Sequence, residues 1–192
     1  MEAYKEIVEF VKQTIKDEKV SGFDHAKRVY DWCETIGRKE GADLEVLRIA
    51  ALLHDVAVPK VGRPKHFEEG ARMAEKFLAE KGFPEKKIRA VSHAIEAHSR
   101  FGGPTPATKE AKILYDADIL DFIGAIGIVR GVGRKLTSGE LTEVEQMPNI
   151  IKNMLKVEDK FYTPSGREFG RERFRFMEKF LEQLGKELVA ER

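Results

Sequence analysis

Two adjacent polar residues, His54 and Asp55, end the apolar run of residues 49–53. A carboxylate beside an imidazole is costly to bury unless a metal or another ion compensates for it. Three further candidates lie elsewhere in the chain, at His25, His98 and Asp118. Neutral imidazole together with carboxylate is the ligand set of Mn, Fe, Co, Ni or Zn. We therefore expect these side chains to converge on a divalent ion.

The hydrophobic pattern predicts the elements that carry these residues. Nearly every segment repeats with a 3.6-residue period and none alternates for long as a β-strand does, which predicts an all-α fold. The expected helices cover about residues 2–19, 24–40, 43–55, 66–81, 84–98, 109–132, 149–160 and 167–190. Asp24 and Asp43 are suited to cap the second and third of these. Residues 58–65, which include Pro59, Gly62 and Pro64, are expected to form a loop.

The helical period also shows which way the candidate ligands point, because a helix advances about 100° per residue. His25, His54, His66, His98 and Asp118 each share a face with apolar residues of the same helix. An aspartate is almost never buried without a partner, and an ordinary core does not need several imidazoles and carboxylates. His93 falls on the opposite face from its apolar neighbours and is expected to be exposed. Asp121 lies about a sixth of a turn from the Asp118 face, close enough to assist the same site.

Composition excludes several classes of protein. The chain has 192 residues, 42% hydrophobic and 35% charged, so it can bury a real core as one domain and is unsuited to disorder or to membrane insertion. The net charge of +1 provides no general attraction for nucleic acid. The single cysteine, Cys33, excludes an internal disulfide framework and fits a reducing, cytoplasmic location. The acidic, amphipathic N-terminus does not resemble a signal peptide.

The order His25, His54-Asp55, Asp118 resembles the H…HD…D signature of the HD-domain metal-dependent phosphohydrolases. Residues 116–130, DADILDFIGAIGIVR, are most similar to the stretch found in the small YpgQ/YedJ-like group. The resemblance implies a single-domain helical bundle over residues 1–192, with an HD core at about 20–135 and a C-terminal helical segment at about 145–190. It also implies that His25, His54, Asp55 and Asp118 bind one divalent ion. His66 and His98 match histidines that complete a second metal site in some members.

The chemistry expected of such a site is hydrolysis of phosphoester or phosphoanhydride bonds by metal-activated water. The group resemblance favours nucleotides as substrates, although no residue was identified that reads a base. Asp55 and Asp121 are the candidate catalytic groups, and His66 or His98 would relay protons if no second ion binds. The candidate phosphate-binding side chains are Lys60, Arg63, Lys65 and Arg100, against the alternative that they are merely solvated.

The sequence leaves other functions open. An HD-type di-iron oxygenase would need His66 and His98 as ligands together with the other four residues. A non-catalytic sensor would bind a nucleotide or metal without turnover, and a helical core with paired polar residues would bind no metal. The metal is expected to be Mn, Co, Ni, Fe, Zn or Mg. The expected partner is a small phosphorylated molecule, with no membrane and no specific nucleic acid, and a homodimer is left open.

Overall fold

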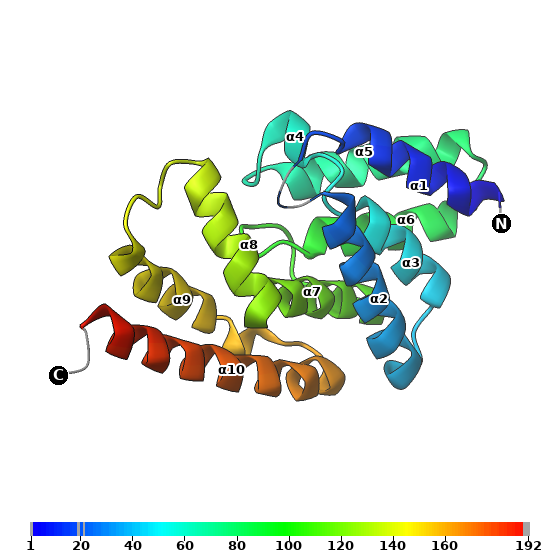
Figure 1. The fold of residues 1–192 in the computed structure, drawn as a ribbon. Helices are drawn as coiled ribbons and strands as arrows, with labels where there is room; N and C mark the ends of the chain where they lie inside the picture. The colour runs from blue at the N-terminus through cyan, green and yellow to red at the C-terminus, as the bar shows by residue number, and fades with distance from the viewer. Residues whose placement is uncertain (1, 19, 21, 190–192) are drawn as a thin grey trace. The chain divides into compact units, whose positions relative to one another are not determined.

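The computed structural model of the chain describes residues 2–18, 20 and 22–189, and these form helices and turns without a β-strand (Figure 1). The predicted all-α fold is confirmed. The helices are α1 (Glu2–Thr14), α2 (Phe23–Glu40), α3 (Leu44–Leu53), α4 (Val58–Val61), α5 (His66–Glu80), α6 (Glu85–Ala97), α7 (Lys109–Phe122), α8 (Gly124–Thr137), α9 (Met147–Leu155) and α10 (Pro164–Leu188), with short 3-10 turns at Val144–Gln146 and Glu158–Lys160. The predicted ends of the first and last helices, Lys19 and Ala190, lie outside the described residues.

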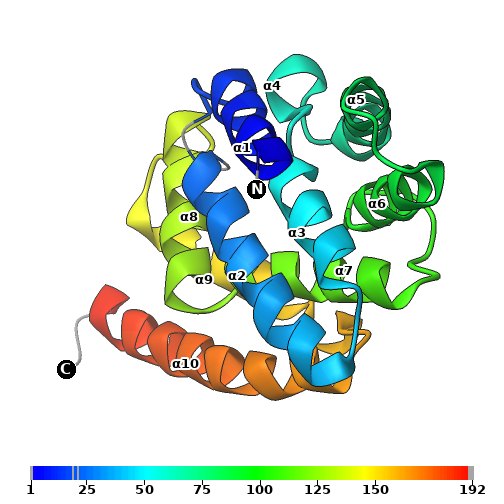
Figure 2. The same cartoon turned by 90° about the vertical axis from the view of Figure 1, so that its right-hand side faces the viewer.

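The chain divides into two compact units, Met1–Asp118 and Ile119–Arg192, with the boundary inside α7. In the first unit, α3 packs against α1, α2 and α6, and α5 packs against α6 (Figure 2). The short helix α4 contacts α5. The single-domain organisation expected from the sequence stays a prediction.

The core of the first unit is built on α3, whose sequence is apolar on nearly every face. Leu47, Leu52 and Leu53 are fully buried, as a central helix requires. The helix begins at the predicted cap, where the Asp43 side chain accepts hydrogen bonds from the backbone N–H groups of Glu45 and Val46 at 3.0 and 3.2 Å. This cap satisfies two donors that the first turn cannot pair within the helix.

Two local expectations for the first unit are wrong. The N-cap of α2 is Gly22, and Asp24 lies in the first turn, where its charge is favourable to the helix dipole. Residues 58–65 are not entirely loop, because α4 occupies Val58–Val61. Pro59 is tolerated there because the first turn of a helix leaves its N–H groups unpaired in any case. Gly62 then ends the helix at a φ of +70°.

The single long helix expected over residues 109–132 is wrong, because the structure has two helices there, α7 and α8. Gly124 adopts a φ of +74°, which favours glycine, and separates α7 from α8. Its N–H donates to Met177 Sδ at 3.0 Å, so the break packs on α10. α10 also packs against α8 and α9.

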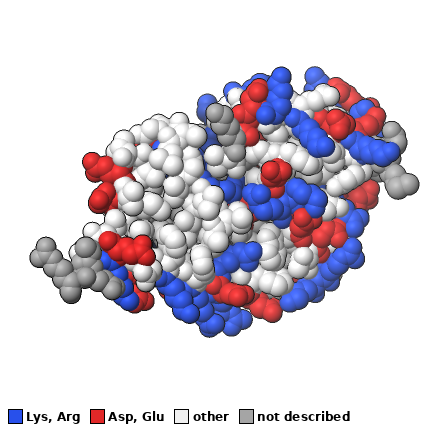
Figure 3. Space-filling model, in the orientation of Figure 1, with Lys and Arg blue, Asp and Glu red and all other residues white. Residues whose placement is uncertain are grey.

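The molecular surface carries mixed charge. Basic and acidic side chains are interspersed over much of the face shown in Figure 3. The second unit also exposes apolar side chains, among them Val129 at 71% and Leu136 at 58%. Among the described residues, no helix combines the length and the apolar composition that crossing a membrane requires.

Candidate metal centre

The first unit gathers buried histidines and aspartates, most of them at or just beyond the ends of its helices. His25 lies in the first turn of α2, His54 and Asp55 follow α3, His66 begins α5, His98 follows α6, and Asp118 lies in α7. All six side chains are buried. Helix ends bring residues that are distant in sequence together without interrupting the apolar packing between the helix bodies.

One group of ligand atoms centres on His25. Its Nε2 lies 3.1 Å from His54 Nε2 and 3.4 Å from both Asp55 Oδ2 and Asp118 Oδ1. His54 Nε2 lies 3.6 Å from Asp55 Oδ2. Ligand atoms about 2.1 Å from one ion are separated by about 3.0 Å at right angles and about 3.4 Å at tetrahedral angles. The spacing of His25, His54 and Asp55 therefore fits a single shared cation. Asp118 adjoins this group through its contact with His25.

The other carboxylate oxygen of Asp55 meets a second group. Asp55 Oδ1 lies 3.4 Å from His66 Nε2 and 3.8 Å from His98 Nε2. The two imidazole nitrogens are 3.1 Å apart. Asp55 therefore stands between two sets of potential ligands, each containing two imidazoles.

Backbone carbonyls fix three of these rings in the same way. The Nδ1 atoms of His54, His66 and His98 lie 2.7, 2.5 and 2.5 Å from the carbonyl oxygens of Ala51, Arg63 and Ile95, each three residues earlier. A carbonyl can only accept, so each Nδ1 donates its hydrogen and a neutral ring presents the lone pair of Nε2 to the cluster. Orientation of a ligating histidine through its second nitrogen is a common feature of metal sites.

The electrostatics favour the neutral form of His54 and His66 and the charged form of Asp55 and Asp118. Burial lowers the pKa of His54 to about 3 and that of His66 to about 4. Burial opposes ionisation of the Asp55 carboxyl, but the neighbouring His54 and Arg63 more than offset it and hold its pKa well below the usual range. Burial likewise opposes ionisation of Asp118, whose pKa is lowered chiefly by the Arg100 guanidinium.

These features fit a divalent metal better than a self-sufficient polar core. Asp55 Oδ2 is buried, and although Arg63 Nη1 lies 3.1 Å away, no donor among the described residues reaches this oxygen with hydrogen-bond geometry. A buried carboxylate oxygen without a hydrogen bond is costly. The facing lone pairs of neutral imidazoles also repel one another unless a cation lies between them. A divalent ion satisfies both the carboxylate and the imidazoles, which are ligands suited to Mn, Fe, Co, Ni or Zn.

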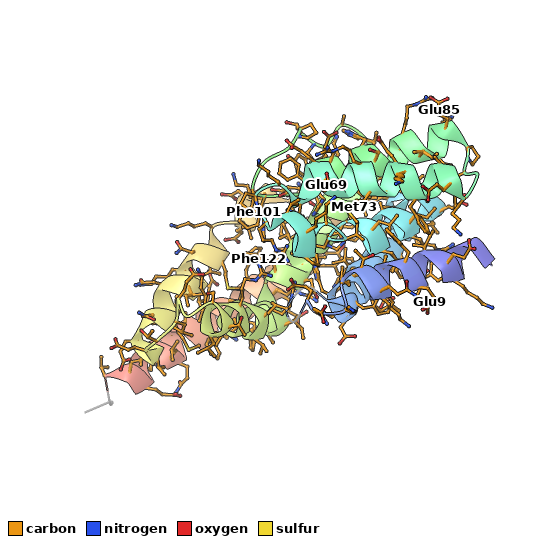
Figure 4. All side chains as sticks on the ribbon, turned by 90° about the horizontal axis from the view of Figure 1, so that it is seen from above. Glu9, Glu69, Met73, Glu85, Phe101 and Phe122 are labelled. Carbon is orange, nitrogen blue, oxygen red and sulfur yellow. The ribbon has the colours of Figure 1, made fainter. Side chains whose placement is uncertain are left out.

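The predicted phosphate-binding cations lie in different surroundings. Arg63 Nη1 is 3.1 Å from Asp55 Oδ2, and Arg100 is close enough to Asp118 to lower its pKa. Lys60 is exposed and pairs with Glu69 at 2.6 Å, on a surface groove that Phe10 also lines. Figure 4 labels Glu69 on the ribbon of the first unit. Lys65 is exposed at the N-cap position of α5. The structure thus brings Arg63 and Arg100 to the cluster and places the two lysines at the surface.

Two further sequence expectations concern Asp121 and His93. Asp121 is buried in the second unit, where its Oδ2 accepts a 2.6 Å hydrogen bond from Arg130 Nη1. Its catalytic role stays a prediction. His93 is half-buried rather than exposed, because its Nε2 accepts a hydrogen bond at 3.1 Å from the backbone N–H of Ala107. This bond ties α6 to the end of the loop that follows His98.

Sequence reasoning missed the contact of Arg63 with Asp55 and the carbonyls that orient the histidines. The sequence did contain a local signal for two of these contacts between a histidine and a backbone carbonyl. His54 and His98 occupy the C-cap positions of α3 and α6, where the last carbonyls of a helix lack intrahelical partners. A histidine placed there can donate Nδ1 to the carbonyl three residues back.

Comparison with known proteins agrees with this geometry. The family model for the HD domain matches residues 22–123, which include every residue of both ligand groups. The chain belongs to the HD-domain family. As an HD protein it is a metal-dependent phosphohydrolase, and its cofactor is a divalent metal held by the buried histidine and aspartate cluster.

Whole-length relatives support the assignment to the HD family. The uncharacterised protein YpgQ of Bacillus subtilis is 33% identical over 185 residues, which cover 92% of this chain and 89% of YpgQ. The crystal structure of YpgQ in complex with ADP superposes with a TM-score of 0.79 and 27% identity, over 97% of this chain and 98% of that one. An HD-superfamily hydrolase from Bacillus thuringiensis superposes with a TM-score of 0.78 and 29% identity, over 99% and 98% of the two chains. The predicted likeness to the YpgQ group is confirmed.

Proposed function

We propose that this HD phosphohydrolase cleaves phosphoanhydride or phosphoester bonds of nucleotides. The observation that carries the proposal is the likeness over nearly the whole chain to YpgQ, whose structure contains ADP. The cluster itself supports a phosphorylated substrate, because buried carboxylates and imidazoles are accompanied by two arginines at hydrogen-bonding or electrostatic range.

In the proposed site, His25, His54, Asp55 and Asp118 hold the ion. When bound, a divalent ion supplies a Lewis acid for a phosphoryl oxygen and makes water more acidic. The chain contributes the rest by orientation, because the carbonyl of Ala51 fixes the His54 ring and Arg63 fixes the Asp55 carboxylate. Protein ligands fixed in this way would leave the remaining coordination positions of the ion to the substrate.

Hydrolysis joins a water oxygen to phosphorus, breaks the phosphorus–oxygen bond to the leaving group and releases a proton. In the absence of a second ion, the Nε2 lone pair of His66 or His98 is proposed to accept that proton. His66 is a weak base for this role, because burial lowers its pKa to about 4. Asp55 Oδ1, 3.4 Å from His66 Nε2, stabilises the imidazolium that forms. These histidines therefore fill the predicted proton-relay role when only the first group binds metal.

Arg63 and Arg100 are proposed to bind the substrate phosphates. A guanidinium carries five N–H donors in a planar fork, so Arg63 can contact Asp55 and a phosphate oxygen together. Lys60 is already paired with Glu69, and Lys65 projects into solvent. The two arginines are therefore the stronger candidates among the four cations predicted from sequence.

The direct test is a substrate panel assayed after chelation and reloading with Mn, Co, Ni or Mg. The panel contains nucleoside mono-, di- and triphosphates and the generic ester p-nitrophenyl phosphate. We expect a higher kcat/KM for nucleotides, and a lower kcat/KM for nucleotides in Arg63→Ala and Arg100→Ala than in the exposed control Arg89→Ala. Turnover of the generic ester without turnover of any nucleotide would contradict the proposed substrate class. Tight nucleotide binding without any turnover would favour the sensor.

The second ligand group supports one alternative. Asp55, His66 and His98 could hold a second ion beside the first, as a di-iron oxygenase requires. Iron analysis of anaerobically purified protein, together with an oxygen-consumption assay, separates the two activities. We favour hydrolysis, with manganese as the first metal to test, because the cluster offers imidazole and carboxylate but no thiolate.

We also propose that the enzyme acts in the cytoplasm. A nucleotide substrate and a single, buried Cys33 are compatible with a reducing cytoplasm. A homodimer is likewise proposed for testing by light scattering, and no specific nucleic acid partner is included.

A further inference from the structure

Phe101 is an exposed aromatic residue in the loop that follows His98. In the described part of the first unit, the large apolar side chains that are exposed are Tyr4 at 37% and Phe101 at 58%. Phe101 comes three residues after His98 and directly after Arg100. Figure 4 shows it outside the helices of this unit. Exposed apolar residues are common on proteins, so the position of Phe101 alone does not assign it a role.

The loop that carries Phe101 is held in place by its neighbours. The backbone N–H of Phe101 donates to Ser99 Oγ at 3.1 Å. The next two residues, Gly102 and Gly103, have φ values of +157° and +99°. A β-carbon at Gly102 would lie 3.2 Å from the ring of Phe67, so the backbone runs directly against that ring.

The far side of the same loop is fixed as well. A β-carbon at Gly103 would lie 2.4 Å from the carbonyl oxygen of Glu96, which shows how closely the loop approaches α6. The backbone N–H of Ala107 donates to His93 on α6. The chain thus fixes the loop backbone at several points while leaving the Phe101 ring in solvent. A side chain on such a loop can bind a flat ligand without the entropic cost of ordering the loop backbone.

Arg100 connects this ring to the cluster. Its guanidinium carbon lies 5.7 Å from the centroid of the Phe101 ring, within the range of a cation–π contact. The same guanidinium interacts electrostatically with Asp118 and Asp55. One residue therefore faces the proposed metal ligands, and the next presents an aromatic surface.

We propose that Phe101 is a specificity residue that stacks on the base of the nucleotide while Arg100 binds the adjoining phosphate. This inference rests on the proposed function, because it assigns the recognition of the base within the same site. Base–aromatic stacking tolerates any base, since every base has a π face. The inference therefore predicts preference for nucleotides over base-free phosphates, with little discrimination between purines and pyrimidines.

The test compares nucleoside triphosphates with inorganic tripolyphosphate, which has the same anhydride chain but no base. We expect Phe101→Ala and Phe101→Leu to raise KM for nucleotides about 5- to 10-fold, with kcat and the KM for tripolyphosphate unchanged. Phe101→Trp retains a π face and should keep the wild-type KM. Tyr4→Ala is the control for removal of another exposed aromatic.

A binding measurement complements the kinetics. In Phe101→Trp, titration with a nucleoside diphosphate should quench tryptophan fluorescence beyond the change given by Trp32 in the wild type, whereas pyrophosphate should not. Thermal melting of each variant checks that the fold is retained.

Each result separates the failure of this inference from that of the proposed function. If the wild type hydrolyses nucleotides and Phe101→Ala leaves their KM unchanged, or raises the KM of nucleotides and tripolyphosphate equally, stacking is overturned and the function stands. If the wild type hydrolyses tripolyphosphate or p-nitrophenyl phosphate but no nucleotide, the proposed substrate class fails and the stacking role fails with it.

Discussion

The Nε2 atoms of His66 and His98 face each other at 3.1 Å, and both rings donate their Nδ1 hydrogen to a backbone carbonyl. Two neutral imidazoles held in this way direct lone pairs at each other, which is unfavourable without a cation between them. Burial lowers the pKa of His66 to about 4, so the His66 ring is neutral at neutral pH. This arrangement is the reason for proposing that His66, His98 and Asp55 could hold a second cation.

Metal removal should destabilise the protein. A ligand present at about 100 times its Kd stabilises the native state by about 2.7 kcal/mol. For a chain of this size, such a loss lowers Tm by roughly 5–10 °C. Differential scanning calorimetry before and after chelation measures the change, and added Mn or Co should reverse it. An unchanged Tm in a protein without bound metal would instead indicate a core of paired polar residues.

His54→Ala should lose the bound metal and the hydrolytic activity, because His54 faces both His25 and Asp55. Asp118→Ala is expected to do the same. The control is His93→Ala, which removes a half-buried histidine that accepts a hydrogen bond from the Ala107 backbone. Metal content by mass spectrometry and turnover should both persist in this control. Wild-type turnover by His54→Ala would exclude the proposed site.

The metal content of variants in the second ligand group should show how many ions each chain binds. If two ions bind, His66→Ala and His98→Ala should each lower the metal content from about two to about one per chain. His25→Ala should lower the content as well, because its Nε2 lies at the centre of the first group. If one ion binds, the His66 and His98 variants should retain it and lose turnover as the proton relay is removed. Retention of both full metal content and full activity would be incompatible with either role.

Gly103→Ala should destabilise the loop that carries Phe101. Positive φ costs a non-glycine residue about 1–2 kcal/mol, and here a β-carbon would also lie 2.4 Å from the Glu96 carbonyl oxygen. Gly82→Ala is the matched control, since Gly82 has a φ of +72° but no atom within 4 Å of the added carbon. Urea denaturation should show a larger loss of unfolding free energy for Gly103→Ala. Equal losses would mean that the loop relaxes away from α6.

Much of the fold could be predicted because the relevant signals are local. The period of apolar residues determines which segments are helical, and Asp43 and Gly41 mark a helix start and a helix end by their own side-chain and backbone preferences. Where prediction failed, packing decided the outcome. Gly124 permits the positive φ that separates α7 from α8, but a glycine alone does not show that a helix ends there. In the folded chain the Gly124 N–H also donates to Met177, more than fifty residues away.

The candidate site, like the fold, could be predicted from the sequence only in part. Residue chemistry and helical spacing predicted that buried imidazoles and carboxylates converge on a cation, but they did not distinguish His66 and His98 from the other candidates. The resemblance to the HD family implied that His25, His54, Asp55 and Asp118 bind one ion. Only the tertiary structure decided that Asp55 lies between two groups of imidazoles and that Arg63 contacts it. These contacts join atoms from separate helices, and their distances depend on how those helices pack, which no periodicity within one helix records.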